Sequence, residues 1–304
     1  MGFRYLRYMG VSSKPTPNEL ANTLFQHLDS SEHSKRRIYD YYLPVFDWIH
    51  EIFTNRSEEE SREALLVGIN GQQGCGKSTL CHYMKMLFRT ASINAIDISV
   101  DDFYLTRSQQ TQLASEHPHN RYLQPRGCPG THDVTFGTEH LSALKNLRAG
   151  ESLRIPKYDK SAFNGLGDRM NTEKWPTVRG PLDVILFEGW TLGFSQIEDF
   201  DNQDVALTDI NARVKNYEPW NHMLDAFILL NPNELEYFLK WRVEAEANRR
   251  LAGEDGLSPE AADAYARLFI PCYEAFLPRL RENPPITHPT LRVDLALDRL
   301  PVQS

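Results

Sequence analysis

Residues 64–78 read ALLVGINGQQGCGKS, and the rest of the chain is best interpreted outward from this stretch. It begins with an apolar run, Ala64 to Ile69, that has the length of a buried parallel strand. The residues from Gly71 onward satisfy the pattern G-x-x-x-x-G-K-[ST]. Between Lys77 and Phe88, apolar side chains recur on one helical face. A strand, a glycine-rich turn and a helix in this order predict a loop that holds phosphate groups.

The residue types in this loop suit a polyphosphate. Glycines let the main chain curl and point its N–H groups inward, and the start of the helix adds a positive dipole end. We expect Lys77 to bridge the β- and γ-phosphates and the Ser78 hydroxyl to bind Mg²⁺. A phosphate loop alone does not separate kinases from GTPases, motor ATPases or transporters, and the absence of the guanine-reading string N-K-x-D disfavours a GTPase. The loop residues predicted to bind the nucleotide are Gly71, Gln72, Gln73, Gly74, Cys75, Gly76, Lys77, Ser78 and Thr79.

Composition sets broad limits on the class of protein. The 304 residues are 41% hydrophobic and 24% charged, as in a globular chain with one large or two small domains. The apolar runs are strand-sized and the N-terminus lacks a secretory signal, so we expect no membrane association. Four scattered cysteines without a CxxC pair favour a reducing, cytoplasmic setting over a disulfide framework. The net charge of −8 disfavours a nucleic-acid partner, and nothing indicates an obligatory protein partner.

Strands and helices alternate after the loop. Further strands are predicted at 95–100, 184–187, 226–230 and 291–297, and helices at 234–250 and 259–280, with Pro271 disturbing the last. This alternation predicts an α/β fold of three layers around a mostly parallel, five-stranded sheet. Residues 1–60 are predicted to be a helical extension packed on the core domain, residues 61–304, and Pro44 to kink or split its second helix. Residues 107–180, with one short helix at 138–149, are predicted to form a substrate cap.

Carboxylates end two of the predicted strands, at the edge where parallel sheets bind ligands. Asp101 and Asp102 follow the second strand, and a carboxylate there can accept the proton of a hydroxyl group that attacks a phosphate. Neighbouring side chains of an extended chain point to opposite sides, so only one of the two is expected to face the phosphate. Glu188 ends the third strand, where an acidic Walker-B side chain would meet the magnesium shell.

Several strings in the sequence together resemble a known family. They are VDDFYLT at 100–106, RG at 126–127, GTHD at 130–133, PKYDKS at 156–161, GDR at 167–169 and LFEGW at 186–190. With the loop at 71–78, they resemble the phosphoribulokinase, uridine kinase and pantothenate kinase group of P-loop kinases. Within that group they are most similar to the plant-type D-glycerate 3-kinases and their fungal and bacterial relatives. The resemblance covers about residues 64–280, and it implies the P-loop NTPase fold and ATP-dependent phosphorylation of a hydroxyl group on a small hydroxy acid.

The resemblance also implies a substrate and residue roles. The implied acceptor is D-glycerate, which would give 3-phosphoglycerate, and the first acid of the D-x-F-Y string is the usual base, which selects Asp101 over Asp102. A lid helix at about 234–256 is implied, with Arg242 and Arg249 on one face to close over ATP. The implied catalytic residues are Lys77, Asp101 and Arg242, and the implied metal ligands are Ser78, Asp101 and Glu188.

The family-like strings of the insert supply the predicted substrate-binding residues. A glycerate carboxylate needs a bidentate arginine or lysines, and four cations lie in these strings. His132 and Asp133 are predicted to hold substrate hydroxyl groups, and Tyr158 to pack against them. The full predicted set is Asp102, Tyr104, Arg126, His132, Asp133, Lys157, Tyr158, Lys160 and Arg169.

Two alternatives stay open on the sequence. The same kinase chemistry could use another acceptor, such as a nucleoside or a pantothenate-like acid, because pockets built from loops vary easily. A protein that binds ATP as a switch, without catalysis, would carry the same phosphate loop. The acidic stretch at 195–208 has no assigned role.

Overall fold

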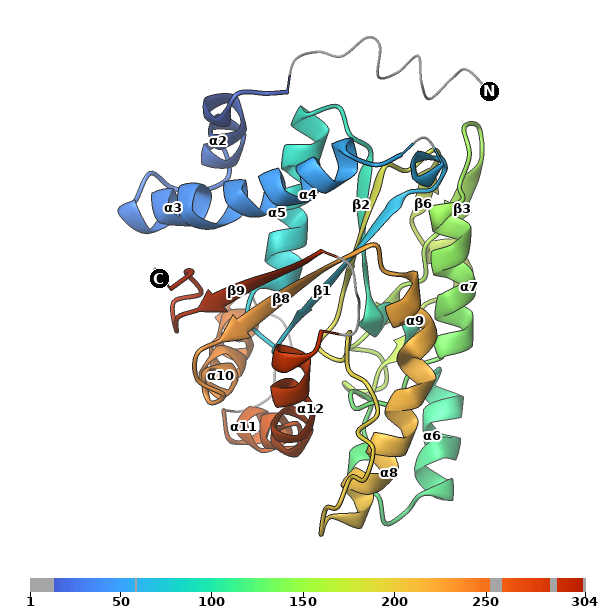
Figure 1. Ribbon diagram of the computed structural model, residues 1–304. Coiled ribbons are helices and arrows are strands. Elements are labelled where there is room, and N and C mark those ends of the chain that lie inside the picture. Colours follow the sequence, from blue (N-terminus) through green and yellow to red (C-terminus); the bar gives the residue numbers. More distant parts are fainter. Residues whose placement is uncertain (1–13, 58, 252–258, 285–288, 303–304) are drawn as a thin grey trace.

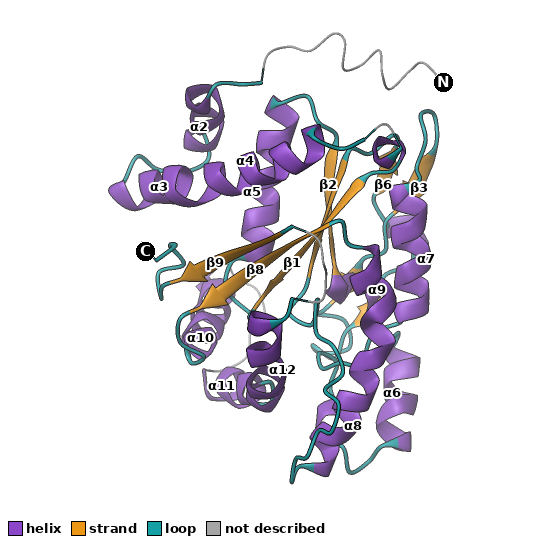
Figure 2. Cartoon of the chain, in the orientation of Figure 1, coloured by secondary structure: helices purple, strands orange, loops and turns teal. Residues whose placement is uncertain are grey.

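A five-stranded parallel sheet forms the centre of the molecule, with strand order β2-β7-β1-β8-β9. The computed structural model describes residues 14–57, 59–251, 259–284 and 289–302. Helices flank the sheet on both sides (Figure 2), so the predicted three-layer α/β/α fold is confirmed. The strands of the sheet are β1 Leu65–Gly71, β2 Ala95–Ser99, β7 Val184–Glu188, β8 Ala226–Pro232 and β9 Thr290–Leu295.

The two faces of the sheet are covered by different helices (Figure 1). On one face α4 and α5 meet through the rings of Phe46 and Phe88, 5.1 Å apart. On the other, α7 and α9 enclose an aromatic cluster of Phe103, Phe187 and Trp220. The helices are α2 Pro17–Phe25, α3 Glu32–Arg36, α4 Leu43–Thr54, α5 Lys77–Thr90, α6 Arg107–Glu116, α7 Val134–Lys145, α8 Val205–Val214, α9 Glu218–Met223, α10 Tyr237–Leu251, α11 Pro259–Arg267 and α12 Ile270–Glu282.

The N-terminal region is helical, as predicted, but its second helix is not split at Pro44, because helical backbone continues from α3 through a π-helical segment into α4. A π-helix, η1 (Arg37–Tyr42), runs into α4, and Pro44 lies in the first turn of α4. The N–H of Leu43 bonds to the carbonyl of Ile38, five residues back, so a π-helical turn lies directly before Pro44, which has no N–H to donate. Ile38 and Phe46 from these two segments are buried in the core. The prediction of residues 1–60 as a separate extension stays a prediction, and residues 1–13 lie outside the described part.

The insert at 107–180 contains more regular structure than its sequence predicts. Its first segment is α6, which begins after a Thr106–Gln109 capping box but has almost no apolar periodicity in its sequence. The predicted short helix is α7, which starts at Val134 because Asp133 caps it. Two small two-stranded antiparallel sheets complete the insert: β3 Ser152–Arg154 with β6 Thr177–Arg179, and β4 Tyr158–Asp159 with β5 Asp168–Arg169.

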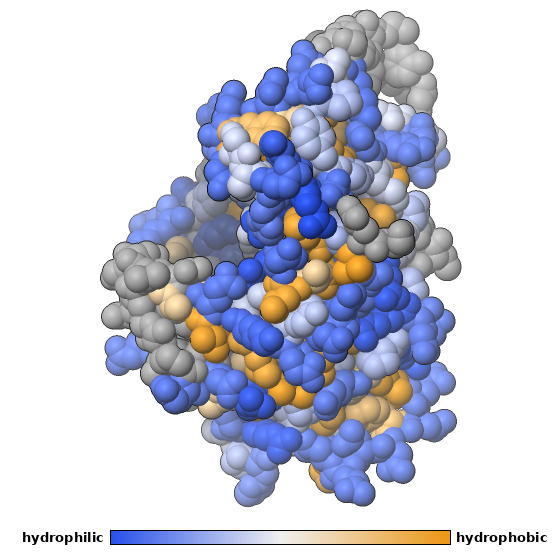
Figure 3. Space-filling view, turned by 90° about the vertical axis from the view of Figure 1, so that its left-hand side faces the viewer, coloured by the Kyte–Doolittle hydropathy of each residue, from blue (hydrophilic) through white to orange (hydrophobic). Residues whose placement is uncertain are grey.

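The C-terminal half follows the predicted order of helices. Pro271 lies in the first turn of α12, so the predicted helix at 259–280 is divided into α11 and α12. Most of the predicted lid at 234–256 corresponds to α10, and its residues 252–256 lie outside the described part. The face of the molecule seen in Figure 3 is mostly hydrophilic, with small hydrophobic patches. Within the described ranges, every helix is too short or too polar to cross a bilayer.

Candidate active site

The glycine-rich loop connects β1 directly to α5. Gly74 and Gly76 have φ angles of 80° and 101°, a left-handed conformation that favours glycine. A Cβ atom at Gly74 would also lie 2.6 Å from the Cβ atom of Trp241 in α10. The Nζ atom of Lys77 donates a hydrogen bond to the carbonyl of Gly71 at 2.9 Å. The lysine ammonium therefore lies over the main chain of the loop, at the start of α5.

The two glutamines of the loop, Gln72 and Gln73, differ in their hydrogen bonds. Gln72 is fully buried, and neither its amide oxygen nor its amide nitrogen has a hydrogen-bond partner in the described part of the chain. The main-chain N–H of Gln73 donates to the hydroxyl of Tyr273 in α12 at 3.0 Å. Buried polar atoms without partners are rare, because each costs roughly 1–3 kcal/mol. Of these atoms only the amide N–H₂ of Gln72 is a donor that a phosphate oxygen could accept from.

Glu188 meets the phosphate loop from the end of β7, as its sequence position predicts. Its Oε1 atom accepts a hydrogen bond from the Ser78 hydroxyl at 2.8 Å. Burial raises the pKa of Glu188, while the nearby charge of Lys77 opposes that shift. In the described residues no three His, Cys, Asp or Glu side chains gather as a metal cage. The oxygen donors of Ser78 and Glu188 instead fit Mg²⁺, which usually takes few protein ligands together with substrate phosphates.

Asp101 and Asp102 lie in a 3-10 turn, η3 (Val100–Phe103), rather than in an extended strand end. Each carboxylate contacts its own lysine from the insert. Lys160 Nζ lies 2.5 Å from Oδ2 of Asp101, and Lys157 Nζ lies 2.5 Å from Oδ2 of Asp102. The insert therefore folds back over the carboxyl edge of the sheet and brings two cations to the two acids.

The two carboxyl groups differ in their electrostatics. Burial of Asp101 raises the pKa of its carboxyl, but the charge and hydrogen bond of Lys160 outweigh this and hold the pKa well below its usual range. Burial raises the pKa of Asp102, and the contact with Lys157 offsets only part of that rise. Asp101 is thus held as the carboxylate anion at neutral pH, next to the phosphate loop.

Aromatic side chains gather next to Asp101. The rings of Tyr104 and His132 stack at 4.4 Å, and Tyr158 packs edge-on against Tyr104 at 5.2 Å. The Nδ1 atom of His132 lies 2.6 Å from the hydroxyl of Tyr217, while its Nε2 atom is buried with no partner in the described part. Burial lowers the pKa of His132 to about 4, against the opposing charge of Asp101, so the ring is neutral at neutral pH.

The two predicted arginines of the insert are engaged with the protein itself. Arg126 donates to the carbonyls of Gly165 and Leu166 at 2.8 and 2.6 Å, and so holds the loop that follows Lys160. Arg169 donates to the carbonyl of Tyr104 at 3.0 Å, and its guanidinium lies 4.2 Å from the ring centre of Phe136.

Asp133 completes this set of contacts. Its Oδ1 atom caps α7, and its Oδ2 atom lies 3.3 Å from Arg169. In this structure Arg126, Asp133 and Arg169 therefore position the walls of the site. Their predicted contact with substrate stays a prediction.

The predicted lid helix, α10, packs against the phosphate loop. The guanidinium of Arg242 lies 5.5 Å from the ring centre of Tyr265 in α11. Arg249 belongs to the same helix, but its side chain lies outside the described part. The predicted contacts of these arginines with ATP stay predictions.

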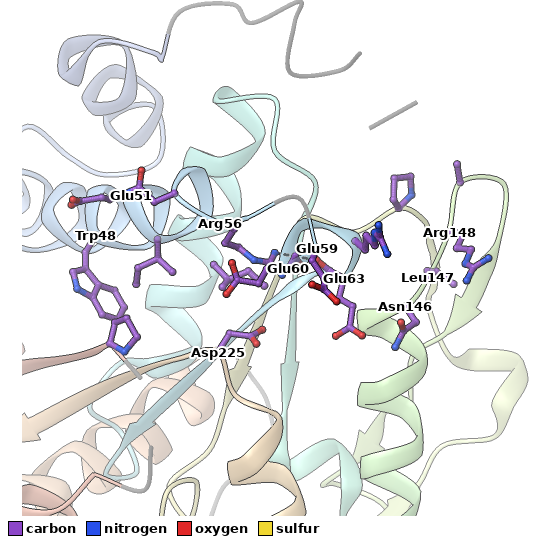
Figure 4. A pocket seen from close by; sticks show the side chains of 17 residues that line it. Trp48, Glu51, Arg56, Glu59, Glu60, Glu63, Asn146, Leu147, Arg148 and Asp225 are labelled. Carbon is purple, nitrogen blue, oxygen red and sulfur yellow. Dashed lines mark hydrogen bonds between the residues drawn. The ribbon is translucent and has the colours of Figure 1, made fainter. Parts of the chain in front are cut away.

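The structure contains two cavities of interest, at opposite edges of the sheet. One, of about 390 Å³, is lined by loop residues from Gly74 to Thr79 and by part of α10. The other, of about 1200 Å³, lies at the amino ends of the strands, near Glu63 and Asp225 (Figure 4). The larger cavity is remote from the phosphate loop, so size alone does not identify the site. Lys77, Asp101 and Glu188 gather at the carboxyl edge instead, next to the smaller cavity.

Sequence reasoning missed the tyrosines that orient the site. Tyr217 holds His132, Tyr273 holds the main chain at Gln73, and the Tyr265 hydroxyl donates to the carbonyl of Arg126 at 3.1 Å. These contacts join segments far apart in the chain. Aromatic residues on helices are ordinarily core residues, so the sequence carries no signal that separates them.

Comparison with known proteins identifies the family of the chain. Residues 66–211 match the model of the "Phosphoribulokinase / Uridine kinase family". A chloroplastic D-glycerate 3-kinase of Arabidopsis thaliana is 37% identical over 88% of this chain, and the match spans 61% of the plant protein. A kinase of Schizosaccharomyces pombe is 30% identical over 85% of this chain and 97% of its own length.

A solved structure agrees with these sequence relatives. A D-glycerate 3-kinase from Cryptococcus neoformans superimposes with a TM-score of 0.75 and 26% identity, covering 86% of this chain and 97% of that one. The matched segment of the family model includes the phosphate loop, Asp101 and Glu188. The chain therefore belongs to the phosphoribulokinase/uridine kinase family of P-loop kinases.

Proposed function

We propose that the protein transfers the γ-phosphoryl group of ATP to a hydroxyl group of D-glycerate, giving 3-phosphoglycerate. The observation that carries this proposal is the contact of Lys160 with Asp101, and of Lys157 with Asp102, beside the phosphate loop. The lysines can bind a carboxylate, and Asp101 can accept a hydroxyl proton. An acceptor that is both an acid and an alcohol, as glycerate is, matches both functions. The D-glycerate 3-kinases among the relatives support the same choice of acceptor.

The proposed reaction begins with an exchange of ionic partners. The acceptor carboxylate binds Lys160 and weakens its contact with Asp101, and the pKa of Asp101 rises because Lys160 holds it low. Asp101 then accepts the proton of the acceptor hydroxyl while that oxygen attacks the γ-phosphorus. The bond from the γ-phosphorus to the bridging oxygen breaks, and ADP leaves with the electron pair. Lys77 stabilises the charge that develops on the phosphates.

We assign the magnesium ion to Ser78 and Glu188, with Asp101 nearby. Bound there, Mg²⁺ would neutralise phosphate charge and fix the angle of attack. Arg242 and Arg249 of α10 are proposed to add positive charge when the lid closes. The unpartnered Nε2 atom of His132 is proposed to bind an acceptor hydroxyl.

The proposal also includes the cellular compartment of the reaction. All four cysteines are buried free thiols, which supports a reducing compartment, and we propose the cytoplasm.

The direct test is acceptor-dependent release of ADP from purified protein with ATP and Mg²⁺. D-glycerate, L-glycerate, uridine and pantothenate form the panel, and ³¹P NMR of the product separates 3-phosphoglycerate from 2-phosphoglycerate. We expect turnover with D-glycerate well above the ATPase background. Turnover with uridine or pantothenate alone would keep the kinase and reject this acceptor. ATP binding without turnover on any acceptor would favour a nucleotide-dependent switch.

A further inference from the structure

The hydroxyl of Tyr217 meets the loop that leads into α7. Tyr217 ends η6 (Lys215–Tyr217), a 3-10 turn between α8 and α9, and α9 lies beside α7 (Figure 1). The main-chain N–H of Gly130 donates to the Tyr217 hydroxyl oxygen at 2.9 Å, and Nδ1 of His132 lies 2.6 Å from the same oxygen. Tyr217 is 2% exposed, so water has little access to these bonds. A turn from late in the chain thus holds the histidine of the GTHD string.

The direction of the bond between Tyr217 and His132 follows from the donors that surround the hydroxyl. Burial raises the pKa of Tyr217, so the hydroxyl keeps its proton, and the main-chain N–H groups of Gly130 and His132 act against that rise by donating to its oxygen. A hydroxyl has one proton and two lone pairs, so these two donors occupy its accepting capacity. Its own proton is left for Nδ1 of His132, which is the acceptor within reach in the described part of the chain.

This bond fixes where His132 carries its ring proton. The ring is neutral at neutral pH, because burial lowers its pKa to about 4 against the opposing charge of Asp101. A neutral imidazole has one nitrogen that donates and one that accepts. With Nδ1 as the acceptor, Nε2 carries the proton, and Nε2 is buried with no partner in the described part of the chain. A buried donor of this kind is unfavourable unless a ligand accepts from it.

The main chain fixes the ring relative to the proposed base. His132 and Tyr104 form an antiparallel bridge, and the N–H of Asp133 donates to the carbonyl of Phe103 at 2.8 Å. The rings of Tyr104 and His132 stack, with an angle of 22° between their planes. Phe103 belongs to η3, the turn that also holds Asp101. The histidine ring and the carboxylate of Asp101 are therefore carried by two bonded segments, at a distance where the charge of Asp101 acts on the ring.

We propose that Tyr217 is a positioning residue, which holds His132 as the Nε2–H tautomer so that the ring donates to the acceptor hydroxyl that is not phosphorylated. The inference rests on the proposed function, in which that hydroxyl is the one at C2 of D-glycerate. The oxygen of a hydroxyl can accept from Nε2–H, whereas an ammonium group has only protons to donate. The pair should therefore select a 2-hydroxy acid over an acid with hydrogen or an amine at C2, because the buried donor would stay unpaired.

The tautomer is tested on the unliganded native protein by ¹H–¹⁵N correlation spectra of its histidine rings at neutral pH. His132→Gln identifies the signals of His132 by their loss. We expect a proton on Nε2 and a bare Nδ1, and a proton on Nδ1 overturns the proposal. Tyr217→Phe removes the donor to Nδ1 and should shift both ring nitrogens toward a mixture of tautomers. Tyr122→Phe is the matched control, because Tyr122 is a buried tyrosine whose hydroxyl bonds to Asp204 at 2.6 Å instead.

Kinetics with two acceptors separate a lost donor from a general disturbance. D-glycerate and 3-hydroxypropanoate differ only in the hydroxyl at C2. Tyr217→Phe should lower kcat/KM for D-glycerate about three- to tenfold, as expected for one hydrogen bond, and leave that for 3-hydroxypropanoate within about twofold. An equal fall for both acceptors, or none for D-glycerate, overturns the proposal. Failure of the native protein to phosphorylate D-glycerate would reject the proposed function, whereas the spectra would still decide the tautomer.

Discussion

The two edges of the central sheet both carry lysine–carboxylate contacts, but these contacts are built differently. At the amino edge, Lys145 contacts both oxygens of Asp225 at 3.1 and 3.0 Å and the carbonyl of Met223 at 3.1 Å. Asp225 also accepts the main-chain N–H of Leu66 at 2.7 Å. This pair is fixed by backbone groups on both sides, next to the larger cavity in Figure 4.

At the carboxyl edge, the pairs have fewer fixed partners. In the described part of the chain, the ammonium groups of Lys157 and Lys160 each contact one carboxylate. Both lysines come from the insert, whereas both carboxylates belong to η3 next to the sheet. Oδ2 of Asp102 also accepts the main-chain N–H of Ser99 at 3.4 Å, so the Lys160–Asp101 pair is the one that can exchange a partner for a ligand at lower cost. We therefore propose that the amino-edge pair is structural and that the Lys160–Asp101 pair at the carboxyl edge is functional.

The largest expected effect is on the rate of phosphoryl transfer after Asp101→Asn. The amide cannot accept the hydroxyl proton, so kcat should fall on the order of 10² to 10⁴, with ATP affinity retained. Steady-state kinetics and calorimetry measure the two quantities. Asp97→Asn is the control, because Asp97 lies on β2 and pairs with Lys85 at the surface. Full activity of Asp101→Asn would remove this residue from the mechanism.

Breaking the amino-edge pair should change stability rather than rate. Asp225→Ala leaves the Lys145 ammonium, which is 10% exposed, without its main partner. We expect a loss of about 3 kcal/mol in the free energy of unfolding, measured by urea denaturation. The kcat of the folded fraction should stay close to the native value. A large fall in kcat with unchanged stability would contradict the assignment of this edge.

Lys160→Met should affect both acceptor binding and the pH profile. Loss of a charged hydrogen bond should lower kcat/KM for D-glycerate about 10- to 100-fold. Lys160 holds the pKa of Asp101 down, so its removal should raise that pKa. Because the base must be ionised, the acidic limb of the kcat/KM profile should move to higher pH. Lys157→Met breaks a contact with Asp102 instead. This variant should weaken binding of the acceptor without shifting the acidic limb of the pH profile.

Mild acid should destabilise the carboxyl edge through His132. Its pKa is lowered to about 4 from 6.5, so between these values the unfolded chain binds the proton more strongly. Stability should therefore fall by about 2 kcal/mol between pH 6.5 and pH 5 from this residue alone. His132→Gln should flatten that part of the stability–pH curve in urea titrations. An unchanged slope in the variant would show that His132 does not titrate in this way.

Local patterns predicted the fold and the phosphate loop well. The five strands, the loop at 71–78 and the position of Glu188 depend on short stretches of apolar or glycine residues, and the sheet confirms them. The prediction missed α6 because its sequence, RSQQTQLASE, is polar almost throughout. The acidic stretch at 195–208 proved to include the Asp204 cap of α8.

Pairings between distant segments could not be predicted. The sequence near Lys160 carries no signal that this side chain contacts Asp101. From the family-like strings, Arg126 and Arg169 were both predicted to bind the substrate carboxylate. The structure instead places both arginines against main-chain carbonyls. Such assignments depend on how the insert folds over the sheet, which is a property of long-range contacts rather than of spacing.

The central position of β1 has a consequence for synthesis of the protein. Leu65 pairs with Val184 and Val67 with Ala226, so both neighbours of β1 come much later in the chain. A nascent chain that ends before β7 has no partner for β1, a strand that is buried along its whole length in the native fold, and its phosphate loop has no framework. Distant pairing of this kind slows folding and prolongs exposure to aggregation. We therefore expect C-terminal truncations that remove β8 to be insoluble, even though they retain every residue of the loop.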